Sequence, residues 1–266
     1  MNWVFLGDSL TEGVGSTRIS YVTELVTQIR TKLKVHEFRL RHVDVDGFID
    51  FNVAGKMDVD QTQSPSDLWI WNLACEGKTI ETDLAWLPLI DTLRPELVVI
   101  FRGSLESIIR PSTLPRWTPG SWRGYAAMDP RCYFSTTWWR SAKQQTIDAA
   151  KQRVRLTQLS RSAGKPLMDR ETITEHLTTL LRRLNTRVLI LGLLPVDEAR
   201  FPGSPAQFKS VNAKLEEIAN AEGAEFFDWG SALGAQRDLF YRDGFHPNLA
   251  GARALAEILR ARLLDE

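Results

Sequence analysis

The sequence predicts an α/β fold: a doubly wound, three-layer α/β/α sandwich with a central, mostly parallel sheet. Three observations predict it. Short apolar runs alternate with segments of helical periodicity along the 266 residues. The runs at 97–101 and 187–194 are apolar without alternation, as expected of parallel strands buried on both faces. Side chains that can carry chemistry follow the ends of these runs, where open α/β sheets bind ligands.

The first predicted elements follow from the spacing of apolar residues and from the length of each apolar run. An apolar strand is expected at 3–6, and a helix over about 19–34, because large apolar residues recur there every four positions. These residues are Tyr21, Leu25, Ile29 and Leu33. Residues 35–67 contain glycines, a proline and several acids, and are interpreted as a loop insertion. The second core strand is expected at 68–73.

The later elements continue the alternation. A helix is expected over 79–93, ended by Arg94-Pro95, because a proline disfavours helix at the residue before it. The strand at 97–101 follows. The remaining predicted elements are helices at 173–184, 211–221 and 249–264 and strands at 187–194 and 225–229.

Length and composition predict one domain, residues 1–266, with an aromatic and basic insertion at about 107–170. Hydrophobic residues make up 43% and charged residues 25%, as in ordinary globular proteins. No secretory signal is visible and no apolar run is long enough to span a bilayer, so a cytoplasmic location is expected. Two cysteines, Cys75 and Cys132, do not amount to a disulfide framework.

Two stretches far apart in the sequence together supply the residue types of serine catalysis. Gly7-Asp8-Ser9-Leu10 follows the first strand, and Asp243-Gly244-Phe245-His246 precedes the last helix. Each alone has a structural explanation, as a helix cap or as a turn before a helix. Together they offer a nucleophile, a base and an orienting carboxylate, which acyl transfer through serine requires. Their joint occurrence favours catalysis.

The chain here resembles the SGNH hydrolases, also called the GDSL esterase/lipase family. Gly7-Asp8-Ser9-Leu10 is similar to the family's nucleophile block, Asn72-Leu73-Ala74-Cys75-Glu76-Gly77-Lys78-Thr79 to its second block, and Asp243 with His246 to its final block. The resemblance implies that Ser9, His246 and Asp243 are catalytic. It also implies that the backbone amides of Ser9 and Gly77 belong to an oxyanion hole.

The third block departs from the family pattern. Residues 95–106 align with a strand that in the family ends in Gly-x-Asn-Asp, but Leu105 stands at the asparagine position and Glu106 at the aspartate position. Loss of one oxyanion donor lowers turnover by about two to three orders of magnitude. Three interpretations remain open: an enzyme with two donors, an enzyme in which Arg102 or Ser104 supplies the third, and a weakened relative that mainly binds.

The insertion has an unusual composition. Residues 107–170 carry 12 lysines and arginines against 3 aspartates, in a chain of net charge zero. One interpretation is a subdomain whose tryptophans form a satellite core and whose arginines are solvated or paired. The other is a lid over Ser9, with aromatic rings for sugars or acyl chains and arginines for acidic groups. The candidate substrate-binding residues are Asp8, Leu105, Trp117, Trp122, Arg123, Trp138 and Trp139.

The expected function is a serine esterase that removes a short acyl group, such as acetyl, from a carbohydrate or small metabolite, which could be anionic. An acyltransferase with the same triad and a binding protein with a degenerate site are the alternatives. No metal or cofactor is expected, because neither zinc-ligand spacing nor a glycine-rich phosphate loop is present. No nucleic-acid partner is expected, because no binding motif accompanies the basic segment.

Overall fold

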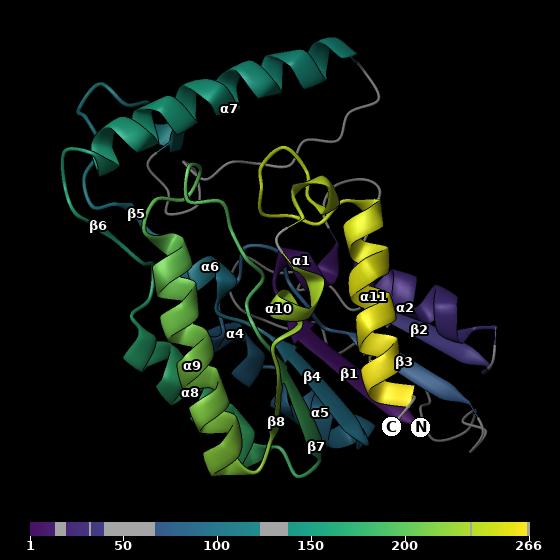
Figure 1. Cartoon of the computed structure of the whole chain (residues 1–266). Helices are drawn as coiled ribbons and strands as arrows, with labels where there is room; N and C mark the ends of the chain where they lie inside the picture. Colours follow the sequence, from purple (N-terminus) through teal and green to yellow (C-terminus); the bar gives the residue numbers. More distant parts are fainter. Residues whose placement is uncertain (14–19, 32, 40–66, 123–137, 235, 265–266) are drawn as a thin grey trace.

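A computed structural model describes residues 1–13, 20–31, 33–39, 67–122, 138–234 and 236–264 (Figure 1). Its centre is a six-stranded sheet in the order β2-β3-β1-β4-β7-β8, in which every pairing is parallel. The strands are β1 (Asn2–Gly7), β2 (Val35–Arg39), β3 (Leu68–Asn72), β4 (Leu97–Phe101), β7 (Arg187–Leu191) and β8 (Glu225–Phe227). This arrangement confirms the predicted fold class.

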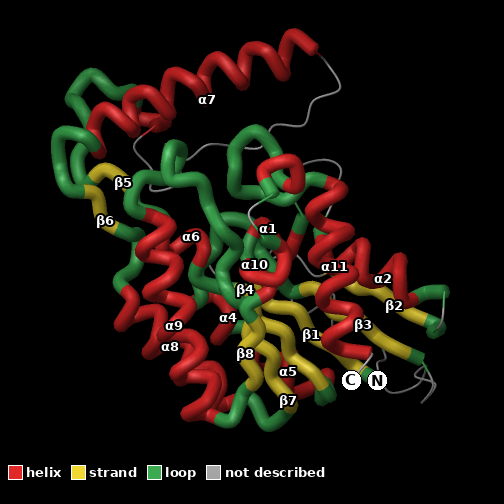
Figure 2. Tube along the Cα trace, in the orientation of Figure 1, coloured by secondary structure: helices red, strands yellow, loops and turns green. Residues whose placement is uncertain are grey.

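Helices cover both faces of the sheet (Figure 2). On one face α2 (Tyr21–Ile29) packs against α11 (Leu249–Leu264). The other face is covered by α5 (Leu87–Leu93), α8 (Arg170–Arg183) and α9 (Ser204–Glu222). Every residue of β3 and β4 is buried, because both faces of these strands are covered. The strand ends at the top of the sheet are thus held by a rigid core. No helix among the described residues is long and apolar enough to cross a membrane.

Several predicted boundaries were wrong, and the strand expected over 187–194 ends at Leu191. Val35–Arg39 is strand β2, not loop, and it pairs with β3 at the edge of the sheet. The helix expected over 79–93 is two short helices, α4 (Glu81–Leu84) and α5. Helix α9 begins at Ser204, seven residues before the predicted start, with a proline in its first turn, where proline is tolerated. Trp229 opens α10 (Trp229–Leu233) and does not end β8.

The insertion contains a long helix that the sequence analysis did not identify. Helix α7 (Trp138–Leu159) runs for 22 residues. Figure 1 shows it beyond the rim at which the strands end. A two-stranded antiparallel ribbon of β5 (Arg110–Pro111) and β6 (Gly164–Lys165) joins the start and end of the segment. The first turn of α8 follows at Arg170, with Asp169 as its N-cap.

Candidate active site

Ser9 lies in a tight turn at the end of β1. The Asp8 side chain accepts a hydrogen bond from the Leu10 amide at 2.9 Å and so caps the short helix α1 (Ser9–Glu12). A Cβ at Gly7 would lie 2.1 Å from Thr11 Oγ1, so the chain can turn this tightly only with glycine there. The cap expected at Asp8 is present, and it orients the hydroxyl next to it.

Ser9, His246 and Asp243 form one hydrogen-bonded chain. Ser9 Oγ lies 2.9 Å from His246 Nε2, and His246 Nδ1 lies 2.7 Å from Asp243 Oδ2. These residues come from opposite ends of the sequence, 237 positions apart. With Nδ1 bonded to the carboxylate, Nε2 faces the hydroxyl and can accept its proton.

The surroundings of Asp243 favour its ionised form. It is 3% exposed, and its Oδ1 accepts hydrogen bonds from the amides of Phe245 and His246 at 3.0 Å each. Burial raises the pKa of Asp243, but the hydrogen bond and charge of His246 and the two amides outweigh it, so the pKa lies below its usual value. The carboxylate can therefore stabilise an imidazolium.

Aromatic packing holds the histidine loop. The Phe245 ring lies edge-on to the His246 ring, with centroids 4.9 Å apart, and 5.9 Å from the Phe201 ring. The Tyr241 amide donates to the His246 carbonyl at 2.9 Å. The imidazole is thus fixed from both its backbone and its neighbouring ring.

The loop that carries Gly77 is anchored to the same rim. The Cys75 amide donates to the Gly7 carbonyl at 2.9 Å, directly beside the serine turn. Arg102 Nη1 donates to the Lys78 carbonyl at 2.7 Å, and the Ile80 amide donates to Glu106 Oε1 at 2.8 Å. Gly77 itself has φ +72°, a conformation that favours glycine. Its amide as an oxyanion donor stays a prediction.

Arg102 has other partners than an oxyanion. It is buried, and its Nε and Nη2 donate to the two carboxylate oxygens of Asp83 at 2.7 and 2.6 Å. With Nη1 on the Lys78 carbonyl, the guanidinium is held away from the substituted-donor role considered for it. Ser104 is also buried, and its Oγ has no hydrogen-bond partner among the described residues. Ser104 therefore remains the side-chain candidate for a third donor.

Three buried carboxyl groups, those of Asp8, Asp83 and Glu106, act on the buried guanidinium of Arg102. Burial raises the pKa of Asp8 and of Asp83 against the attraction of Arg102. Burial likewise raises the pKa of Glu106 to about 7, opposed by Arg102 and reinforced by Asp8. One oxygen each of Asp8 and Glu106 lacks a hydrogen-bond partner among the described residues. Because burial disfavours the charged carboxylate and the nearby Asp8 adds to this effect, the pKa of Glu106 lies near neutral pH.

The tryptophans of the insertion are mostly exposed. Trp117, Trp138 and Trp139 are 69%, 80% and 50% exposed, so the satellite-core interpretation is wrong for them. Trp122 is half-buried, with Lys151 Nζ 5.7 Å from its ring centroid. Arg123 lies outside the described residues. The structure does not bring these tryptophans into contact with Ser9, and their role in substrate binding stays a prediction, as does that of Leu105, which is half-buried in α6 (Ser104–Ser107).

Sequence reasoning missed the residues that support the site. Asp83 falls on the buried face of α4, where a helical pattern calls for an apolar side chain. The available signal for a buried ion pair was an aspartate on an apolar helix face together with an arginine just after a buried strand. The role of Glu106 as a hydrogen-bond acceptor for Ile80 had no such signal in the sequence.

Comparison with known proteins shows the family and the fold. The model of the GDSL-like lipase/acylhydrolase family matches residues 5–254. No curated protein matches the sequence significantly. A lipase/acylhydrolase from Enterococcus faecalis superposes with a TM-score of 0.57 at 17% identity, covering 99% of this chain and 95% of that one.

Two further solved structures share the fold. TesA superposes with a TM-score of 0.54 at 15% identity, covering 100% of this chain and 99% of that chain. Axe2, an acetylxylan esterase from Geobacillus stearothermophilus, has a TM-score of 0.54 at 13% identity, with 98% and 92% covered. At such identities these structures establish the fold alone. Through the family model, the chain belongs to the GDSL-like lipase/acylhydrolase family and is an ester-hydrolysing enzyme.

Proposed function

We propose that the protein is a serine esterase that works through an acyl-enzyme on Ser9, with His246 as general base and Asp243 as its orienting carboxylate. The observation that carries the proposal is the continuous hydrogen-bonded chain from Ser9 Oγ through His246 to Asp243. A neutral hydroxyl becomes a competent nucleophile when a positioned imidazole removes its proton.

The reaction has two halves. Ser9 Oγ attacks the ester carbonyl while His246 Nε2 takes its proton; collapse of the tetrahedral intermediate breaks the bond to the alcohol, which leaves with that proton. Water then attacks the acyl-enzyme, again losing a proton to His246, and the carboxylic acid departs from Ser9. The amides of Ser9 and Gly77, with Ser104 Oγ as the third candidate, face the developing oxyanion.

The proposed substrate is a short-chain O-acyl ester, such as an acetyl ester, of a carbohydrate or small metabolite. The shared fold of Axe2, whose name describes an acetylxylan esterase, supports this class. A sugar hydroxyl could replace water in the second half without any change in the residues, because both routes share the acyl-enzyme.

The test compares wild-type protein with Ser9→Ala on 4-nitrophenyl acetate and 4-nitrophenyl octanoate. We expect turnover of the acetyl ester and an acetyl adduct by intact mass, both absent in Ser9→Ala; Ser160→Ala, at an exposed serine at the end of α7, serves as the control. If the Ser104 hydroxyl is a donor, Ser104→Ala should lower kcat by about a hundredfold or more. Turnover that survives Ser9→Ala would refute the assignment. Added methyl glycosides that divert acetate to acetylated sugar would identify a transferase.

A further inference from the structure

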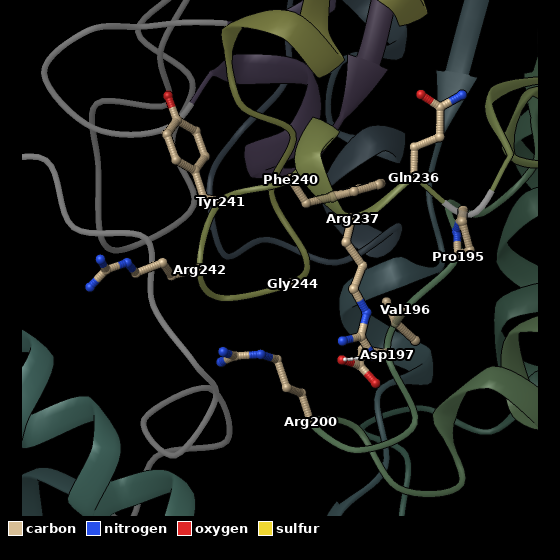
Figure 3. Close-up of a pocket in the computed structure, with 10 residues that line it drawn as sticks. All are labelled: Pro195, Val196, Asp197, Arg200, Gln236, Arg237, Phe240, Tyr241, Arg242 and Gly244. Atoms are coloured by element: carbon tan, nitrogen blue, oxygen red, sulfur yellow. Dashed lines mark ion pairs between the residues drawn. The ribbon is translucent and has the colours of Figure 1, made fainter.

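A pocket of about 490 Å³ adjoins the loop that carries the base. It is lined by two segments, 195–200 and 236–244, and Gly244 belongs both to its wall and to the Asp243–His246 turn. Figure 3 shows its side chains, several of which are arginines. A substrate held at Ser9 would therefore have a second recessed surface next to the same loop.

The pocket is cationic. Arg200, Arg237 and Arg242 line it, against a single aspartate, Asp197. Arg237 Nη2 is paired with Asp197 Oδ2 at 2.9 Å, the contact dashed in Figure 3. Arg242 Nη1 donates to the neutral amide oxygen of Gln145 at 2.9 Å. The Arg200 side chain has no hydrogen-bond or ion-pair partner among the described residues. Two guanidinium groups thus keep their charge for a ligand.

Arg200 is held in place by its neighbours. Its carbonyl accepts hydrogen bonds from Arg155 Nη1 and, at 2.8 Å, from Gln152 Nε2, both on α7. Its side chain crosses Gly244 so closely that a Cβ at position 244 would lie 2.9 Å from Arg200 Cδ. Gly244 has φ +66°, which also favours glycine. The half-buried arginine therefore lies directly on the catalytic loop, and its position is fixed by the insertion.

We propose that this pocket binds a carboxylate or phosphate on the alcohol part of the ester, with Arg200 and Arg242 as its ligands. The inference rests on the proposed esterase function. It narrows the substrate class to esters whose alcohol part carries a carboxylate or a phosphate. A planar guanidinium binds both anions through two parallel hydrogen bonds, which gives orientation as well as affinity. Helix α7 then acts as a support for specificity, because it fixes the backbone of one arginine and contacts the side chain of the other.

The test uses three acetylated sugars that differ only at C6: a mono-O-acetyl methyl glucoside, its 6-carboxylate (glucuronoside) and its 6-phosphate. We expect kcat/KM to favour at least one anionic ester over the neutral one by about tenfold or more. Arg200→Gln should reduce that preference by about tenfold, Arg242→Gln by about threefold because it is exposed, and the double variant should abolish it. The carboxylate and phosphate esters separate the two possible anions.

Matched controls isolate charge at the pocket. Arg182→Gln removes an exposed arginine on α8 that is paired with Glu222, and should leave the preference unchanged. Arg200→Lys keeps the positive charge but loses the planar guanidinium that can form two parallel hydrogen bonds. It should therefore retain part of the preference for anionic esters. The preference should also decline between 50 and 500 mM NaCl, because salt screens exposed charges.

The outcomes separate this inference from the esterase proposal. Ser9-dependent hydrolysis of all three sugars at equal rates, or a preference that persists in the double arginine variant, would overturn the pocket assignment and leave the esterase intact. If no ester is turned over, calorimetry on Ser9→Ala decides: tighter binding of the anionic sugars that is lost with Arg200→Gln supports the pocket, and equal binding of all three overturns it.

Discussion

At the sheet rim Arg102 is buried among carboxyl groups, whereas in the insertion Arg155 is buried among main-chain carbonyls. Arg102 forms a two-pronged pair with Asp83. Arg155 donates through Nη2 to the Ile109 carbonyl at 2.8 Å and through Nη1 to the Arg200 carbonyl, and it lies over the Phe201 ring at 5.0 Å. The cluster around Arg102 has more carboxyl groups than cations. The insertion has more cations than carboxylates.

The difference shows two ways to bury a charge. A carboxylate partner neutralises Arg102 but introduces a second ion that must also leave water, so removal of either partner strands the other. The two carbonyls that accept hydrogen bonds from Arg155 are neutral, so its loss leaves neither of them as a buried ion. The insertion also inverts the usual burial of apolar side chains and exposure of charged ones. Three of its tryptophans are exposed, while Arg155 is buried. Four measurements test this contrast.

The largest effect is expected at the rim. Arg102→Met should lower the free energy of unfolding by about 3–5 kcal/mol, because Asp83 would remain buried without its counter-ion. Urea unfolding measures it. Arg182→Met, which breaks the exposed Arg182–Glu222 pair, should cost at most about 1 kcal/mol. Equal losses of unfolding free energy in the two variants would contradict the description of Arg102 and Asp83 as a buried ion pair. Asp83→Leu combined with Arg102→Met should recover much of the loss.

The next effect depends on pH. The pKa of Glu106 is raised by burial from its usual value of 4.5 to about 7, so the folded protein holds this proton over a range in which the unfolded chain has lost it. Stability from this group is therefore complete below pH 4.5 and falls as the pH rises to about 7, by roughly 3 kcal/mol at most.

Glu106→Gln removes that titration and keeps an oxygen to accept from the Ile80 amide. It should raise stability at pH 8 and flatten the pH dependence between pH 4.5 and 7, measured by urea unfolding at three pH values. Glu257→Gln, on α11 at an exposed position, is the control. A variant with the same pH dependence as wild type would show that Glu106 titrates normally.

A smaller effect is expected in the insertion. Arg155→Met should cost about 2 kcal/mol, because the carbonyls of Ile109 and Arg200 lose a charged donor. Arg153→Met, exposed on the same helix, should change stability by less than 0.5 kcal/mol. Chemical denaturation compares the pair. Identical midpoints for both variants would mean that Arg155 does not anchor α7.

The smallest effect concerns the exposed rings. Trp138→Ala should leave the free energy of unfolding within about 0.5 kcal/mol of wild type, because its side chain is 80% exposed. Its kcat/KM for a sugar ester, measured beside that for 4-nitrophenyl acetate, tests the lid prediction separately. A selective loss with the sugar would support substrate contact, and no loss with either ester would remove Trp138 from the site.

The core strands could be predicted because burial on both faces leaves an unbroken apolar run, as at 97–101 and 187–191. Strand β2 could not, because it lies at the sheet edge and its sequence, Val-His-Glu-Phe-Arg, has only two apolar residues and no polar–apolar alternation. Helix α7 was missed for a different reason. Two of its buried positions are Lys151 and Arg155, and a search for apolar periodicity cannot find a face made of cations.

The candidate catalytic residues could be named from sequence because each stands in a short local motif. Their supports could not, because Asp83, Arg102 and Glu106 act through contacts between segments that are distant in sequence. The pocket at Arg200 and Arg242 could not be predicted either, since it is assembled from two segments that are distant in sequence, 195–200 and 236–244. The basic charge of the insertion pointed to an anion, but the two arginines proposed as its ligands lie outside that insertion.

The separation of 237 residues between Ser9 and His246 has a consequence for synthesis. A ribosome completes the serine turn, the Gly77 loop and the buried acid cluster while the Asp243–His246 turn is still untranslated. Domains fold as units when enough chain has emerged, and here α11 must dock on α2 to close the sheet face next to the serine turn. Under the proposed mechanism the nucleophile stays inert on every chain that ends before His246, so esterase activity requires translation and folding through the Asp243–His246 turn.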